Sequence, residues 1–255
     1  PKPEKSWFTE GPKSGADAQQ NNAPLLGIVV TEPNVALNIR ENIGEHTKLL
    51  AKLDKGTKLH ILDCLGQWYQ VQLDNGQTGY ALGNYVKLLP KLPYINTGCP
   101  KETCTYGKWK LKSPAMLYDK PSFDTASIAQ LEVQQTLQAG DGQLHTSQYG
   151  EITVVKNMEI KVLPLDVPVE KKETLKLTSG DLLFDLEYQG QRVHVVWYQG
   201  KLYYLEEGWN PQTTPQVDLW GKTVTERKSD WWVQVEIPDK NLHGWIANPN
   251  AENVK

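Results

Sequence analysis

Short runs in which apolar and polar residues alternate dominate the chain after about residue 25. The clearest run extends from Trp68 to Leu73, and its period of two is typical of a strand with one buried face. Asp74, Asn75 and Gly76 follow and provide the residues of a tight hairpin turn. No segment shows a 3.6-residue apolar period over ten or more residues, and only residues 125–131 would allow a short helix. The pattern therefore predicts an all-β protein.

Two segments interrupt this pattern and suggest how the chain is divided. Residues 1–24 are rich in Pro, Gly, Gln, Asn and charged residues, which predicts a flexible arm. Residues 93–111 carry several Pro and Gly residues and predict a linker. We therefore expect a folded domain at residues 25–92 and a second region at residues 112–255, divided at about residue 206 into 112–206 and 207–255.

Motifs of the first domain recur later in the chain, as in a repeat protein. A split second copy has its first half at residues 115–131 and its second half at residues 180–204, with roughly residues 140–174 inserted between them. A third fragment at residues 232–246 mirrors residues 68–81 but has no first half, unless the inserted strands supply one. The C-terminal region is thus either two interleaved barrels or one enlarged lobe.

The first copy, at about residues 30–89, closely resembles the bacterial SH3 domain family. The resemblance is carried by five short motifs: Leu37-Asn38-Ile39-Arg40, Lys55-Gly56-Thr57, Trp68-Tyr69-Gln70-Val71, Asn75-Gly76 and Gly79-Tyr80-Ala81. It implies tandem small SH3-like β-barrels, the second with an insertion and open to fusion with a third. It also implies a periplasmic, secreted or otherwise envelope-associated protein.

A barrel of this family implies a shallow groove of half-exposed aromatic rings with polar edges, which suits extended peptides and peptide-like polymers. The expected groove residues of the first copy are Trp68, Tyr80 and Tyr85, with Asn38, Arg40 and Asn42 as the polar edge. The comparable C-terminal set is Trp231, Trp232 and Trp245. For each residue the alternative is structural: Trp68 would cap the barrel, Tyr80 would belong to the core, and Arg40 would pair with Glu41 or Glu45. Because Tyr118 stands at the Arg40 position, we expect the copies to bind different ligands.

The composition favours surface binding by aromatic rings and excludes some partners. Nine Trp and eleven Tyr accompany only three Phe, and Trp and Tyr carry a polar tip that suits half-exposed sites. The net charge of -3 provides no one-sided basic field for nucleic acid or anionic membrane. No apolar stretch reaches 18 residues, so no segment is expected to span a membrane. Because the chain begins at Pro1, we expect a processed product, from which any signal peptide or lipid-bearing cysteine would already be absent.

The cysteines and histidines suggest structure rather than catalysis. Cys99 and Cys104 suit a small surface disulfide in an oxidising compartment, although two reduced thiols are the alternative, and Cys64 is expected to be buried in a strand. The histidines show no metal-ligand spacing, and no nucleophile or phosphate-binding motif occurs. We therefore expect no enzyme, metal or cofactor.

Three functions agree with these observations. The first is a binding protein that recognises peptidoglycan peptides or an envelope protein. The second is a scaffolding envelope protein whose barrels contact only other proteins, and the third is an inhibitor of a cell-wall hydrolase.

Overall fold

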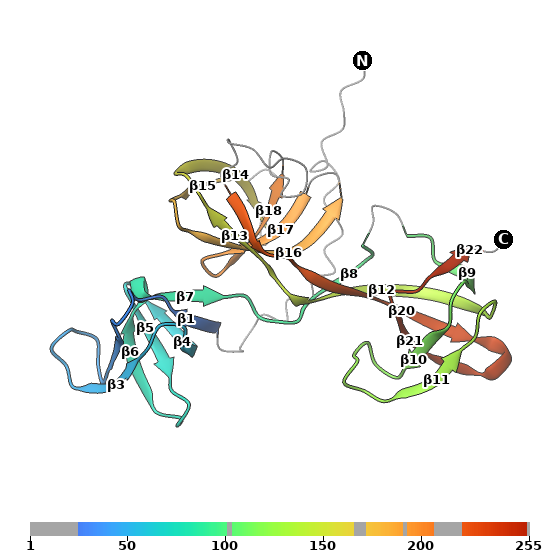
Figure 1. The fold of residues 1–255 in the computed structure, drawn as a ribbon, viewed down its shortest axis with the longest axis horizontal. Helices are drawn as coiled ribbons and strands as arrows, with labels where there is room; N and C mark the ends of the chain where they lie inside the picture. The colour runs from blue at the N-terminus through green and yellow to red at the C-terminus, as the bar shows by residue number, and fades with distance from the viewer. Residues whose placement is uncertain (1–24, 101–103, 166–171, 191–192, 207–220, 254–255) are drawn as a thin grey trace, which may run out of the picture. The chain divides into compact units, whose positions relative to one another are not determined.

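The computed structural model describes residues 25–100, 104–165, 172–190, 193–206 and 221–253. The arm expected at residues 1–24 lies outside this range. The prediction of an all-β protein is confirmed, since strands form three curled sheets and the only helices among the described residues are two short 3-10 helices (Figure 1). The chain divides into two compact units: one contains the first sheet together with residues 197–201, and the other contains the rest of the remaining two sheets.

The first sheet contains seven antiparallel strands in the order β3-β2-β6-β5-β4-β1-β7. Its strands are β1 (Leu25–Val29), β2 (Leu37–Arg40), β3 (Leu49–Leu53), β4 (Lys58–Leu65), β5 (Trp68–Gln72), β6 (Thr78–Leu82) and β7 (Val86–Leu89). Alternate residues of neighbouring strands point inward, including Leu37, Ile39 and Val71, which are almost fully buried. The period of two in the sequence therefore produces one core face and one outer face.

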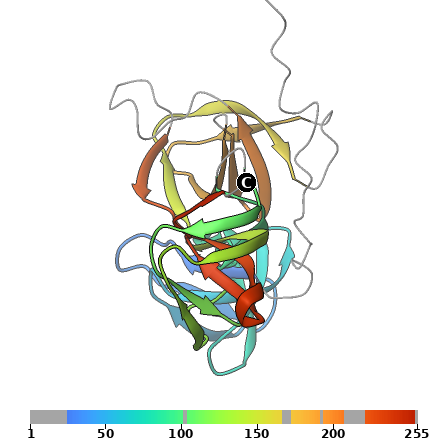
Figure 2. The ribbon, with the colours of Figure 1, turned by 90° about the vertical axis from the view of Figure 1, so that its right-hand side faces the viewer.

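The second sheet, which we call the outer sheet, has the order β11-β10-β21-β20-β12-β9-β22, and β8 also pairs with β12. Its strands are β8 (Tyr94–Thr97), β9 (Gly107–Leu111), β10 (Ala115–Tyr118), β11 (Ser127–Leu131), β12 (Thr136–Gln148), β20 (Lys228–Ile237), β21 (Leu242–Ala247) and β22 (Ala251–Asn253). Leu117, Leu131, Val233 and Ile246 are among its core residues, each with no exposed surface. Figure 2 shows green and red strands side by side in this sheet, because it joins two distant parts of the chain.

The third sheet, which we call the inserted sheet, has the order β15-β14-β18-β17-β16-β13-β19. Its strands are β13 (Gly150–Val154), β14 (Met158–Pro164), β15 (Glu173–Leu177), β16 (Leu182–Gly190), β17 (Val193–Tyr198), β18 (Lys201–Glu206) and β19 (Gly221–Thr225). Five consecutive residues of β16, Leu183 to Glu187, are buried. Both faces of this strand are therefore covered, which is unusual for a strand in an antiparallel sheet with one wet face.

All three sheets share one topology. If the seven strands of each sheet are numbered by their order along the chain, all three sheets have the same spatial order of strands. The fourth strand, for example, is β4 in the first sheet, β12 in the outer sheet and β16 in the inserted sheet. The inserted sheet lies between β12 and β20, where the first sheet has only the short turn at Gly66 between β4 and β5. β12 and β20 remain paired from Gln138–Glu236 to Gln148–Lys228. A complete seven-stranded sheet thus interrupts a hairpin of another.

This nesting corrects the expected assembly of the C-terminal region. The first half at residues 115–131 is completed by residues 232–246, because β10 pairs with β21. The segment at residues 180–204 instead pairs with strands of the insertion, as β16 with β13 and β18 with β14. The sheets consequently do not follow the expected division near residue 206. Of the two readings left open, two interleaved units agree with the structure.

The local structure differs from the sequence reading at two further places, the helix that residues 125–131 would allow and the linker expected at residues 93–111. Residues 127–131 form β11 instead of a helix, since they pair with β10 along its whole length and Leu131 is buried in the core. The segment at residues 93–111, expected as a linker, contributes β8 and β9 to the outer sheet. Because Pro and Gly residues lie next to these short strands, the apolar runs of the segment were hard to recognise in the sequence.

Candidate functional site

A row of outward-facing side chains crosses four strands of the first sheet. Arg40 on β2 stands opposite Tyr80 on β6, Tyr80 opposite Gln70 on β5, and Gln70 opposite Asp63 on β4. Residues directly opposite each other in an antiparallel pair project from the same face. Arg40, Tyr80 and Gln70 are half-buried and Asp63 is exposed. We call these four residues the polar row; it has a cation at one end and a carboxylate at the other.

The guanidinium of Arg40 is positioned by the loop that follows β2. Its Nη1 donates a hydrogen bond to the Thr47 carbonyl oxygen at 2.7 Å, and the Thr47 hydroxyl donates to the Asn42 carbonyl oxygen at 2.8 Å. Among the described residues, Arg40 forms no ion pair with Glu41 or Glu45, which was the structural alternative. Glu41 instead lies 4.0 Å from the Lys48 ammonium. Arg40 uses one of its five N–H donors in this bond, so others remain for a ligand.

The other residues expected in the first groove differ in exposure. Asn38 and Asn42 are exposed, and Tyr85 retains 45% of its surface in the 3-10 turn η2 (Gly83–Tyr85). Trp68 retains only 6%, so its ring is a structural element of the sheet and not a surface for a ligand. Its expected role in the groove is therefore corrected to the structural alternative.

Cys64 also differs from its expected place. It is exposed near the end of β4, as one of four consecutive exposed residues that follow Ile61. Partial burial of the sulfur, followed by the negative charge of Asp63, raises the pKa of the Cys64 thiol. A raised pKa reduces the thiolate fraction, which makes this cysteine a weak nucleophile.

The outer sheet carries aromatic rings at the corresponding positions. Tyr118 stands opposite Trp245, and Trp245 stands opposite Gln234, in the register of Arg40, Tyr80 and Gln70. Gly79 and Gly244 occupy equivalent sites before Tyr80 and Trp245. An added Cβ on Gly79 would lie 2.6 Å from the Ile39 Cγ2 atom, and one on Gly244 would overlap the Tyr118 carbonyl oxygen. Both sheets therefore use glycine to let β6 or β21 approach β2 or β10 closely.

Four rings gather on this face of the outer sheet. Trp232 lies with its ring centre 4.7 Å from that of Phe123, 5.4 Å from Tyr118 and 6.2 Å from His145. Trp232 is 2% exposed whereas Phe123 is 57% exposed. Trp232 is therefore structural, and Phe123, which the sequence did not single out, presents the accessible ring. Burial is the main cause that lowers the pKa of His145, so this ring is mostly neutral near pH 7.

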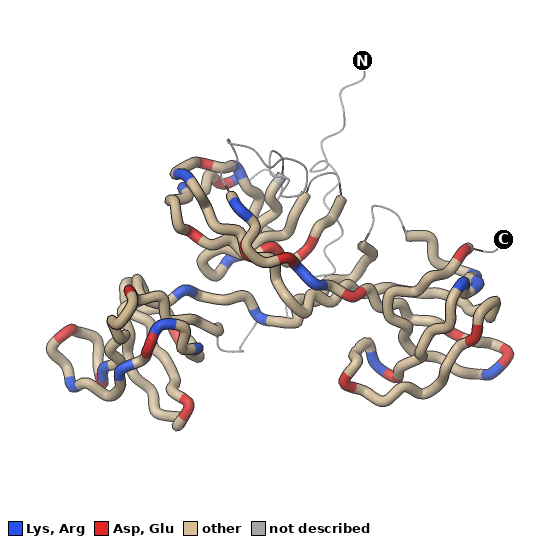
Figure 3. Tube along the Cα trace, viewed as in Figure 1, with Lys and Arg blue, Asp and Glu red and all other residues tan. Residues whose placement is uncertain are grey.

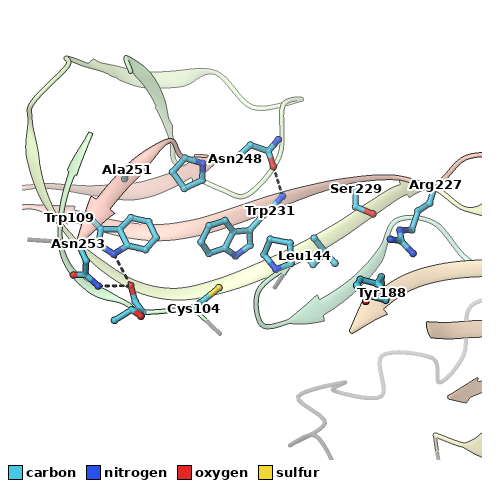
Figure 4. Close-up of a pocket in the computed structure, with 13 residues that line it drawn as sticks. Cys104, Trp109, Leu144, Tyr188, Arg227, Ser229, Trp231, Asn248, Ala251 and Asn253 are labelled. Atoms are coloured by element: carbon cyan, nitrogen blue, oxygen red, sulfur yellow. Dashed lines mark hydrogen bonds between the residues drawn. The ribbon is translucent and has the colours of Figure 1, made fainter. Parts of the chain in front are cut away.

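The third expected tryptophan, Trp231, lies on the opposite face of β20 and lines a pocket of about 560 Å³. Figure 4 shows Trp231 and Leu144 in the middle of the pocket, Trp109 and Asn253 at one end, and Tyr188 and Arg227 at the other. The ring centres of Trp109 and Trp231 are 5.9 Å apart. The three C-terminal tryptophans therefore do not form one groove, because neighbouring strand residues project from opposite faces.

One cysteine of a disulfide bond, Cys104, lines this pocket. Cys99 and Cys104 are bonded, as one of the two readings of the sequence expected. The carbonyl oxygen of Gly98 accepts hydrogen bonds from the Trp231 Nε1–H at 3.2 Å and from the Tyr106 hydroxyl at 3.5 Å. The residue before Cys99 is thereby hydrogen-bonded to the indole at the centre of the pocket.

A buried polar cluster lies beside the pocket on β16. The Arg227 guanidinium donates to Asp185 at 2.7 Å, and His194 Nδ1 lies 3.1 Å from the other oxygen of Asp185. Asn96 Nδ2 contacts both carboxylate oxygens of Glu187 at 2.9 Å. Burial raises the pKa of Glu187 more than these polar partners lower it. The cluster covers the second face of β16 and explains how buried carboxylates are tolerated there.

Basic and acidic residues are interspersed along all three sheets (Figure 3). Among the described residues, no group of three or more His, Cys, Asp or Glu side chains could hold a metal ion. The same residues contain no helix that is long and apolar enough to cross a membrane.

Residues 35–87 match the family model of the bacterial SH3 domain. The resemblance seen in the sequence of the first copy is therefore confirmed, and the polar row lies within the matched bacterial SH3 domain. No curated protein sequence matches the chain.

Two solved structures show weak similarity to the chain. NlpC2 from Trichomonas vaginalis is 10% identical over 76% of this chain and 51% of its own, with a TM-score of 0.24. NlpC1 from the same organism is 9% identical over 72% of this chain and 44% of its own, with a TM-score of 0.25. This chain thus spans about half the length of each. At these scores neither structure defines a fold or an activity for it.

Proposed function

We propose that this chain is a non-catalytic binding protein of the cell envelope and that its bacterial SH3 domain recognises the peptide part of peptidoglycan. The observation that carries the proposal is the polar row, which places a guanidinium, a half-buried ring, an amide and a carboxylate in line across one face. A peptidoglycan stem peptide carries both carboxylates and amines. Its carboxylate would pair with Arg40 and an amine with Asp63.

The ring of Tyr80 supplies the apolar part of this contact. It stands between Arg40 and Gln70 in the register of the strands, so a peptide that spans the two charges must cross it. A rigid ring buries area at low entropic cost, while the flanking polar groups set the orientation of the ligand. Exposed Asn38, Asn42 and Tyr85 would extend the contact beyond the row.

The same geometry favours binding over catalysis. The row is open to solvent at Asp63, and the nearby Cys64 thiol has a raised pKa. Strong activation of a nucleophile needs a lowered pKa and a site that excludes water. Bacterial SH3 domains are typically binding modules and occur in extracellular and envelope proteins, and the Cys99–Cys104 bond suits such an oxidising compartment.

Cosedimentation of the full chain with purified peptidoglycan tests the proposal. Tyr80→Ala should reduce the bound fraction, because it removes the ring of the row. Tyr69→Ala is the matched control: Tyr69 is a half-buried tyrosine on the neighbouring strand, but it stands opposite the buried Ala81 and lies outside the row. The comparison requires that both variants keep the melting temperature of the unaltered chain.

Two outcomes would contradict the proposal. If the unaltered chain does not cosediment at low salt, peptidoglycan is not its ligand, and the scaffolding alternative is favoured. If Tyr69→Ala and Tyr80→Ala lose binding equally, the contact does not depend on the polar row.

A further inference from the structure

The pocket around Trp231 differs in chemistry from the polar row of the bacterial SH3 domain. Its middle is apolar, with Trp231 and Leu144, and its ends carry amides, hydroxyls and one guanidinium (Figure 4). The described lining includes no Lys, Asp or Glu. A site of this composition suits an uncharged ligand that combines a flat apolar surface with many hydroxyl or amide groups.

The indole N–H groups of the pocket are already used within the protein. Trp109 Nε1 donates to the Thr105 carbonyl oxygen at 2.8 Å, and Trp231 Nε1 donates to the Gly98 carbonyl oxygen. The half-buried Trp231 therefore offers a ligand its ring surface and not its polar edge. The face of an aromatic ring has a negative electrostatic potential and attracts weakly positive hydrogen atoms, such as those of the C–H groups on the face of a pyranose sugar.

The polar ends of the pocket are held in place and keep capacity for further hydrogen bonds. Asn248 accepts the Trp231 backbone N–H at 2.8 Å and donates one Nδ2 hydrogen to Asp230 at 2.7 Å, which leaves its second Nδ2 hydrogen. Asn253 donates to Thr105 at 3.2 Å through its own Nδ2, and among the described residues its carbonyl oxygen has no partner. Such amides match the hydroxyl and acetamido groups of a sugar.

We propose that this pocket binds the glycan strand of peptidoglycan, with one pyranose ring stacked on Trp231. The inference rests on the proposed function, because it assigns the sugar part of the same polymer to a second site. The volume of about 560 Å³ lies within the range of roughly 300–1,000 Å³ typical of small-molecule sites. An elongated pocket with an apolar middle and polar ends suits a short chain of linked sugars. The chain would then hold peptide and glycan at separate sites, which increases its avidity for the intact polymer.

Isothermal titration of the full chain with a β-1,4-linked N-acetylglucosamine tetrasaccharide tests this inference. We expect the unaltered chain to bind it and Trp231→Ala to weaken binding at least tenfold. Trp245→Ala is the matched control, because Trp245 is a half-buried tryptophan of the same sheet that projects from the other face and does not line the pocket. If Trp231→Ala lowers the melting temperature strongly, Tyr188→Ala replaces it, since Tyr188 lines the pocket with 38% of its surface exposed.

A parallel titration with a sugar-free stem peptide separates the two proposals. Binding of the peptide without binding of the tetrasaccharide overturns the glycan site and leaves the proposed function intact. Binding of the tetrasaccharide without the peptide supports the pocket and overturns the role of the polar row. Equal loss in Trp231→Ala and Trp245→Ala, or binding of inorganic phosphate in place of the sugar, would also overturn the glycan site.

Discussion

Substituting Trp68 by alanine should strongly destabilise the bacterial SH3 domain instead of merely removing a ligand contact. Trp68 retains 6% of its surface, and truncation of a buried Trp typically costs about 3–5 kcal/mol. A domain the size of residues 25–92 has a free energy of unfolding of about 3–10 kcal/mol, at roughly 0.05–0.15 kcal/mol per residue. The substitution therefore removes a large part of this stability.

Hydrogen–deuterium exchange of the full chain provides a local measurement of this effect. We expect faster exchange in peptides from β1 to β7 in Trp68→Ala, with little change in the inserted sheet as an internal reference. Tyr80→Ala should leave exchange in the first sheet nearly unchanged. If Trp68→Ala exchanges like the unaltered chain and yet loses binding to peptidoglycan, Trp68 faces a ligand and the assignment of this residue to the core is wrong.

Three further substitutions and one chemical treatment test the packing. Gly79→Ala and Gly244→Ala should each lower the free energy of unfolding by about 1–3 kcal/mol in urea titrations, because the added Cβ meets neighbouring atoms; near-zero effects would contradict the close approach. Burial raises the pKa of Glu187, so its ionisation as pH rises above about 4.5 should destabilise the fold. Glu187→Gln should therefore gain melting temperature relative to the unaltered chain between acidic and neutral pH, and a pH-independent difference would refute this. Reduction of Cys99–Cys104 should cost about 2 kcal/mol for so short a loop, seen as a lower melting temperature in dithiothreitol.

The sequence was sufficient to predict the bacterial SH3 domain because all its signals are local. The alternation from Trp68 to Leu73 and the glycine of the turn at Gly76 act within one hairpin, and the hairpin formed as expected. The same motifs identified β20 and β21 as a related hairpin. What they could not reveal is which distant first half completes it, because β10 and β21 pair across more than a hundred residues.

The candidate site was harder to predict, since exposure depends on contacts outside the motif. Trp68 and Trp232 occupy equivalent strand positions and were expected in grooves, yet both are buried. Phe123, in the loop before β11, gave no sequence signal because a single ring in a polar loop has no period. Trp231 was predicted to bind a ligand as part of one groove with Trp232. Because neighbouring residues of a strand project from opposite faces, Trp231 points into the pocket instead.

The most direct test of the central claim is to map where a purified stem peptide contacts the full chain, using backbone amide chemical shifts in solution. The polar row predicts that the largest changes fall in residues 37–42 and 78–85, with smaller changes around Gln70 and Asp63. The changes should disappear in Tyr80→Ala and persist in Tyr69→Ala. Changes confined to other parts of the chain, or none at a saturating peptide concentration, would contradict recognition by the bacterial SH3 domain.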